Sequence, residues 1–81
     1  MKKIKISYFA ILREARGQKE EVVLTQAPTA RALYEELKIK HAFPLHENQL
    51  KVAINNAYVD WLTPVEENDE VVFIPPVAGG A

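Results

Sequence analysis

The chain has 81 residues, no cysteine, and ten basic against eleven acidic residues, for a net charge of -1. This length makes one small domain, and 48% hydrophobic with 26% charged residues is typical of a globular protein. The absence of cysteine fits a reducing compartment, and we expect a cytoplasmic protein. The charge balance gives no electrostatic case for nucleic acid, the missing cysteines exclude disulfides and thiolate sites, and no apolar run approaches the ~20 residues that span a membrane.

The first part of the chain predicts an antiparallel hairpin. Residues 3–8 alternate between polar and apolar side chains, as a strand with one buried face requires. Phe9 then falls on the polar side of this alternation, where an aromatic ring is unexpected. Residues 20–24 contain two adjacent valines and predict the second strand. We expect the connection from Ala10 to Gln18 to be a loop.

A helix is predicted to follow Pro28, with Thr29 as its N-cap. Apolar residues recur there at three- and four-residue spacing through about Ile39. Residues 41–48 contain a proline and show no period, so they predict a loop. The two histidines of the chain lie in this loop without a third ligand at metal spacing, and we expect both to be solvated.

The second half of the chain predicts three more strands. Residues 51–54 and 58–59 flank an Asn-Asn turn that tolerates positive φ, and residues 70–74 form the last strand. The prolines that follow end the sheet because they donate no ladder hydrogen bond. This order favours an α+β fold, in which a mixed four- to five-stranded sheet packs on one main helix. This is the β-grasp, or ubiquitin-like, arrangement, expected over residues 1–76.

The last five residues, 77–81, predict a flexible and extended C-terminal tail. They end in Gly79-Gly80-Ala81, and glycine lets a backbone enter a channel that larger side chains would block. A frayed terminus without function accounts for the same composition. Composition alone therefore leaves both interpretations open.

Strand alternation also predicts a docking surface. If Phe73 faces the helix, Ile74 faces the opposite side of the sheet. Phe9 would join Ile74 there, and Tyr58 would join them from the neighbouring hairpin. A cluster of exposed apolar residues beside a thin tail favours docking of a partner, although loop residues that cover the cluster are the simpler alternative.

Two motifs resemble those of the small subunits of molybdopterin synthase, a sulfur-carrier family of ubiquitin-like β-grasp proteins. The more specific ones are Phe-x-x-Leu-Arg-Glu at residues 9–14 and Pro-Pro-Val-x-Gly-Gly at residues 75–80. Residues 52–55 and 68–71 carry further similarity, so that the resemblance covers nearly the whole chain. Sulfur carriers of the thiamine pathway are shorter and lack the proline pair.

The resemblance implies that the chain carries sulfur on the carboxyl group of Gly80. An E1-like enzyme would use ATP to adenylate this carboxylate, and a sulfur donor protein would convert it to a thiocarboxylate. The loaded tail would enter the large synthase subunit, in a heterotetramer of two small and two large subunits, and deliver sulfur to cyclic pyranopterin monophosphate. Catalytic groups are expected on the large subunit, and this chain is expected to bind no cofactor or metal.

We expect particular residues to contact partners. On the domain these are Phe9, Tyr58 and Ile74, from strand alternation, and Arg13, from the resemblance. Along the tail they are Pro75, Pro76, Val77, Ala78 and Gly79. The family pattern ends at the second glycine, whereas this sequence continues with Ala81, so a free Gly80 carboxylate requires removal of Ala81. Three alternatives remain open: a carrier for another pathway such as thiamine, a ubiquitin-like modifier conjugated through Gly80, and an interaction module with an inert tail.

Overall fold

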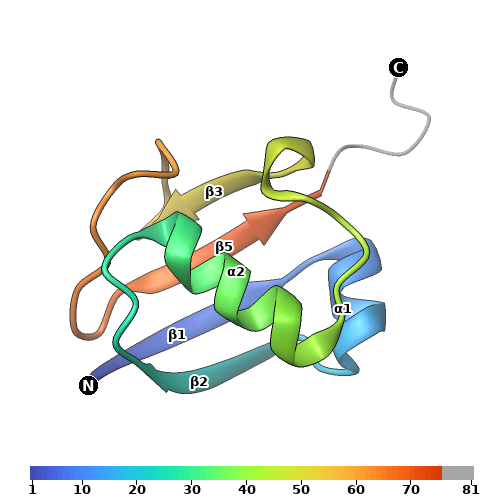
Figure 1. Cartoon of the computed structure of the whole chain (residues 1–81), viewed down its shortest axis with the longest axis horizontal. Helices are drawn as coiled ribbons and strands as arrows, with labels where there is room; N and C mark the ends of the chain where they lie inside the picture. Colours follow the sequence, from blue (N-terminus) through green and yellow to red (C-terminus); the bar gives the residue numbers. More distant parts are fainter. Residues whose placement is uncertain (76–81) are drawn as a thin grey trace.

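The alternating segments form one mixed sheet of five strands in the computed structural model, which describes residues 1–75. The strand order is β2-β1-β5-β3-β4, and β1 and β5 are parallel while all other neighbours are antiparallel. One long helix, α2, lies across one face of the sheet (Figure 1). The predicted β-grasp fold is confirmed. The strands are β1 (Lys2–Tyr8), β2 (Glu20–Thr25), β3 (Lys51–Ile54), β4 (Ala57–Val59) and β5 (Glu70–Ile74).

The core lies between α2 and the inner face of the sheet. Each strand contributes every second residue, because successive side chains of a strand point to opposite faces. Aromatic rings fill the centre: Tyr34 of α2 packs on Phe73, Phe43 and Trp61. Burial of each large apolar side chain stabilises the fold by roughly 1.5–3 kcal/mol. The fully buried apolar residues include Ile4, Ile6, Tyr8, Leu12, Leu33, Tyr34, Val71 and Phe73.

Helix α2 (Ala30–His41) begins as the sequence predicts and ends two residues later than expected. The Oγ1 atom of Thr29 accepts a hydrogen bond from the Ala32 N–H at 3.2 Å, which satisfies one of the unpaired donors of the first turn. Ala42 is the C-cap that follows the helix, and its φ of 54° and ψ of 46° are left-handed. This conformation disfavours alanine because its Cβ approaches the carbonyl oxygen.

Residues 10–16 form a second helix, α1 (Ala10–Arg16), so the prediction of a loop from Ala10 to Gln18 is wrong. The helix buries Leu12 completely and ends at Gly17, which adopts φ 80° and donates its N–H to the Arg13 carbonyl. A short 3₁₀ helix, η1 (Glu47–Gln49), interrupts the second predicted loop. None of the helices in residues 1–75 has the length and hydrophobicity of a transmembrane segment.

The sheet topology places the candidate site. Because β1 and β5 are parallel, their C-terminal ends lie at the same end of the sheet, beside α1 (Figure 1). Phe9 therefore leaves β1 where Ile74 leaves β5. On the other side of the sheet, Asn55 and Asn56 adopt positive φ and join β3 to β4 as predicted.

Candidate docking surface

The sheet face opposite α2 carries a row of apolar side chains across three strands. Val72 of β5 lies opposite Ala53 of β3, and Ala53 lies opposite Tyr58 of β4. One step along β5, Ile74 lies opposite Lys51. All these residues have the same parity in the sheet, because their neighbours Val71 and Phe73 are fully buried on the α2 side. The prediction that Ile74 faces away from the helix is confirmed.

Phe9 extends this row on the β1 side of Ile74. Its φ of -122° and ψ of 151° continue the extended backbone of β1, so its side chain points opposite to that of the buried Tyr8. Phe9 is 45% exposed. Ala10 then takes a φ of 51°, and this left-handed residue turns the chain sharply into α1. We call Phe9, Ala53, Tyr58, Val72 and Ile74 the outer-face patch.

The patch is hollowed between Tyr58 and Ile74. These two side chains line one depression of about 340 Å³, together with Lys51 and Pro75. Tyr58 is 71% exposed, whereas Ile74 is half-buried and Pro75 is buried. The structure therefore brings three of the predicted contact residues, Tyr58, Ile74 and Pro75, to the wall of the same depression.

Two residues at this surface, Ala53 and Lys51, escaped sequence reasoning. They lie there because β3 pairs antiparallel with β5, and this pairing joins residues far apart in the chain. Val72 was predictable, because strand alternation along residues 70–74 places it on the same face as Ile74. Lys51 places one exposed ammonium group among apolar side chains.

Arg13 lies one helical turn after Phe9 and is exposed. Phe9 precedes the helix and Ala10 turns the chain sharply, so the position of the Arg13 guanidinium at the rim of the outer-face patch stays a prediction. A surface ion pair with Glu14 or Glu70 was the alternative role, and no such pair occurs among residues 1–75.

Glu21 anchors α1 to the sheet. Its carboxylate accepts hydrogen bonds from the Tyr8 hydroxyl and from Arg16, whose Nε and Nη2 atoms lie 3.0 and 2.9 Å from its two oxygens. The hydrogen bonds from Arg16 lower the pKa of Glu21. The pKa of Tyr8 is raised, mainly because its hydroxyl is buried and also because it is hydrogen-bonded to Glu21. This cluster holds the helix that follows Phe9, and nothing in the local sequence pattern indicated it.

His41 completes the cluster and corrects a prediction. Its side chain is only 13% exposed and packs on Phe43, so it is not the solvated loop residue expected from the sequence. The Nε2 atom lies 3.7 Å from Oε2 of Glu21 and has no hydrogen-bond partner among the described residues. Burial lowers the pKa of His41, and the nearby Arg16 charge lowers it further. The other histidine, His46, is exposed as expected.

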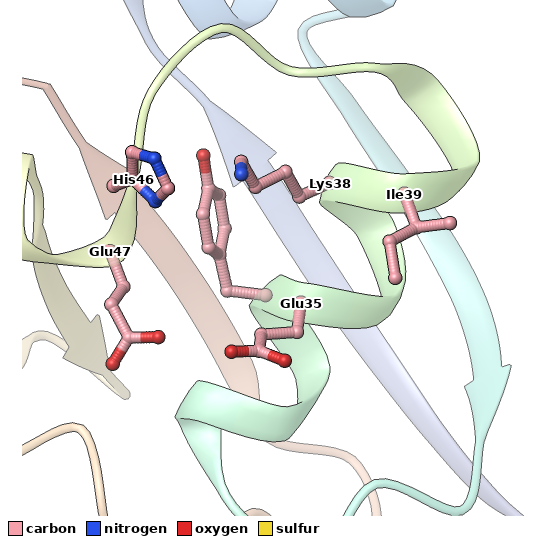
Figure 2. A pocket seen from close by; sticks show the side chains of 6 residues that line it. Glu35, Lys38, Ile39, His46 and Glu47 are labelled. Atoms are coloured by element: carbon pink, nitrogen blue, oxygen red, sulfur yellow. The ribbon is translucent and has the colours of Figure 1, made fainter.

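A second depression, of about 200 Å³, lies on the helical side of the molecule between α2 and residues 46–47. Figure 2 shows His46 and Glu47 facing Glu35 and Lys38 of α2 across it. Arg31 pairs with both carboxylates, at 2.9 Å from Glu47 and 4.0 Å from Glu35. Within residues 1–75, no group of three or more His, Asp or Glu side chains is placed to hold a metal ion.

The reactive end predicted from the sequence lies outside the described residues. This applies to the proposed carrier residue Gly80 and to the tail contacts Pro76, Val77, Ala78 and Gly79, and also to Ala81. Of the predicted contacts, the described residues therefore include Phe9, Arg13, Tyr58, Ile74 and Pro75.

Comparisons with known proteins agree with the fold and extend it to a family. The sequence profile described as the ThiS family matches residues 6–80. The chain is 35% identical over 80 residues to the molybdopterin synthase sulfur carrier subunit of Escherichia coli (strain K12), which covers 95% of this chain and 99% of that protein. The chain therefore belongs to the ThiS family of β-grasp proteins.

Two solved structures have the same fold. A Pyrococcus furiosus protein, described as a candidate molybdopterin converting factor subunit 1, superposes with a TM-score of 0.79 at 32% identity, over 95% of this chain and 100% of that one. A chain of the complex of subunits 1 and 2 of the molybdopterin-converting factor from Helicobacter pylori 26695 superposes with a TM-score of 0.67 at 20% identity, over 96% of this chain and 99% of that one. The second likeness is evidence of the fold alone.

Proposed function

We propose that this chain is the sulfur carrier and small subunit of a molybdopterin synthase. The observation that carries the proposal is the full-length match to a relative of that name, together with a family match that runs to Gly80. The paired glycines 79 and 80 lie within this match, directly after the strand that ends at the outer-face patch.

The proposed chemistry takes place on the carboxyl group of Gly80. A free carboxylate is a poor electrophile, so an adenylating enzyme first joins it to AMP from ATP and releases pyrophosphate. A sulfur donor protein then supplies sulfide, which displaces AMP and leaves a thiocarboxylate with one oxygen replaced by sulfur. The carboxyl group of Gly80 is free for this chemistry only when Ala81 is absent, because otherwise the Gly80 carbonyl forms the peptide bond to Ala81. The chain needs no bound cofactor for these steps.

The outer-face patch is proposed to bind the large subunit, on which we place the catalytic groups. Exposed aromatic residues at the centre of an interface commonly contribute about 2 kcal/mol or more to binding, and Phe9 and Tyr58 are 45% and 71% exposed. The tail would then enter the active site of the large subunit from the adjacent end of β5. We propose the same two-plus-two assembly that the family resemblance implies, with the E1-like enzyme using the same patch.

Two isoleucine variants test this docking. Ile74→Ala removes a side chain from the patch, while Ile39→Ala removes an 82% exposed side chain from α2 on the other side of the molecule. We expect Ile74→Ala to weaken binding of the large subunit by about tenfold or more, which corresponds to ~1.4 kcal/mol, and Ile39→Ala to leave it unchanged. Isothermal titration calorimetry measures both. Equal affinities for the two variants would contradict the proposed surface.

The remaining alternatives differ in the fate of the activated Gly80. A ubiquitin-like modifier would form an isopeptide bond with a lysine, and a carrier for another pathway would load sulfur without binding the large subunit. An inert tail would be neither adenylated nor loaded. Mass analysis of the activated chain separates these outcomes.

A further inference from the structure

The outer edge of β2 has hydrogen-bonding groups that the sheet does not use. The Tyr8 N–H donates to the Lys19 carbonyl at 2.8 Å, and the β1–β2 register continues from this pair without a break. In an antiparallel pair, hydrogen-bonded residues alternate with residues whose backbone groups point away. The backbone groups of residues 21, 23 and 25 therefore form hydrogen bonds to β1. The N–H and C=O groups of Glu20, Val22 and Leu24 point away from β1, in the plane of the sheet and past its free edge.

This edge has few of the features that normally prevent edge-to-edge pairing. Proteins protect edges with charged side chains, above all lysine, and with proline, bulges or very short strands. Strand β2 has the sequence Glu-Glu-Val-Val-Leu-Thr, six consecutive pairs and no bulge, and its charges are confined to Glu20 and Glu21 at one end. Val22 and Leu24, whose side chains lie on the sheet face opposite α2, are 60% and 64% exposed. The opposite edge, β4, is only three residues long. Within residues 1–75, no hydrogen bond reaches the outward backbone groups of β2.

We propose that β2 pairs antiparallel with β2 of a second copy of this chain, which joins the two sheets into one. The free edge is complementary to itself about a two-fold axis at Val22. Val22 then faces Val22 of the second copy, and Glu20 faces Leu24 of the second copy on each side of the axis. These three pairs each exchange two backbone hydrogen bonds and use every outward group of residues 20, 22 and 24.

The charges favour this arrangement. Leu24 lies opposite Lys3 on the same face of the sheet. Antiparallel pairing places Glu20 of the second copy opposite Leu24, and so near Lys3. Lys3 has no ion pair among residues 1–75, and Glu20 has only a weak one with Lys5, at 3.9 Å with both side chains about half exposed. Parallel pairing would instead place the two Glu20 side chains side by side, and like charges directly opposite destabilise a sheet.

The dimer is expected to be weak, because only two apolar side chains from each copy enter the interface. The free energy gained in so small an interface only slightly exceeds the cost of the translational freedom lost on association. We therefore expect a dissociation constant on the order of 100 μM. The outer-face patch lies toward the other edge of the sheet, so dimerisation leaves it accessible.

Sedimentation equilibrium of the isolated chain over a range of concentrations tests the proposal without any partner protein. We expect a reversible monomer–dimer equilibrium for the wild type. Val22→Pro removes an outward N–H that the β1–β2 ladder does not use, and proline is tolerated at such edge positions. This variant should stay monomeric while its circular dichroism spectrum is unchanged. The control Ile39→Lys changes an exposed side chain away from β2 and should dimerise like the wild type.

A charge swap tests the register. Lys3→Glu alone and Glu20→Lys alone should each weaken the dimer about threefold or more, and the double variant should restore it. A wild-type chain that is monomeric at millimolar concentration would overturn the proposal. A dimer that persists unchanged in Val22→Pro would also overturn it, because the contact would then lie elsewhere. The docking experiment with Ile74→Ala is independent of either outcome.

Discussion

Replacing Glu21 with glutamine removes the negative charge that holds α1 on the sheet. We expect this variant to lower the free energy of unfolding by about 2–4 kcal/mol. The carboxylate accepts one bond from Tyr8 and two from Arg16, and hydrogen bonds to charged groups are worth about 1.5–3 kcal/mol each. Glutamine keeps one acceptor oxygen but turns an NH₂ group toward these donors. About half of the gross interaction should therefore be lost.

The adjacent residue provides the control. Glu20→Gln makes the same chemical change on the opposite face of the same strand, where the only ion pair of Glu20 within residues 1–75 is the exposed one with Lys5 at 3.9 Å. Exposed pairs of this kind contribute little, so we expect a change below about 0.5 kcal/mol. Both variants leave the backbone propensity of β2 nearly unchanged, and the comparison isolates the buried interaction.

Urea denaturation at neutral pH and low protein concentration measures both variants. Trp61 packs against Phe73 and Tyr34, so its fluorescence reports loss of the core. Stability follows from the shift of the midpoint at constant slope. If Glu21→Gln and Glu20→Gln differ by less than about 0.5 kcal/mol, the Glu21 cluster does not hold α1, and the reasoning is refuted.

The remaining predictions concern pH and the end of α2. The pKa of both His41 and Glu21 is lowered in the folded state, so the unfolded chain binds protons more readily at both sites. Stability should therefore be greatest above pH 6.5, the ordinary histidine value, and fall in two steps on acidification, first for His41 and then for Glu21. In a series of urea midpoints measured against pH, His41→Gln should remove the first step. Ala42→Gly should raise stability by about 0.5–1 kcal/mol, because glycine relieves the left-handed strain and loses part of this gain through the entropy of the unfolded chain. The control Ala32→Gly, in the first turn of α2, should lower thermal stability because its backbone is helical, and a loss of stability in Ala42→Gly would contradict the strain argument.

The strands and α2 were predictable because their signals are local. The alternation in residues 3–8, the Thr29 cap and the Asn55-Asn56 turn each specify a conformation with few neighbours, and all three are observed. Helix α1 was not predictable in this way. It has seven residues, no side-chain cap at Phe9 and one buried residue, Leu12, so tertiary contacts such as the Glu21 cluster stabilise it.

The candidate surface was predictable in part. Parity gave the outward facing of Phe9 and Ile74 from the sequence of each strand alone. The neighbours Ala53 and Lys51 depend on strand order and register, which join residues distant in the chain. His41 was predicted to be solvated because the sequence shows no partner near it, whereas β2 brings Glu21 to within 3.7 Å.

The most direct test of the sulfur-carrier function is the intact mass of the chain before and after sulfur delivery. A chain that ends at Gly80 is incubated with the adenylating enzyme, ATP and the sulfur donor, and then with the large subunit and cyclic pyranopterin monophosphate. We expect the mass to rise by the exchange of one oxygen for sulfur and to return to the carboxylate value as the dithiolene product forms. The chain that retains Ala81 should show neither change. Retention of the thiocarboxylate in the presence of the large subunit and substrate, or equal loading of the chain that keeps Ala81, would contradict the account.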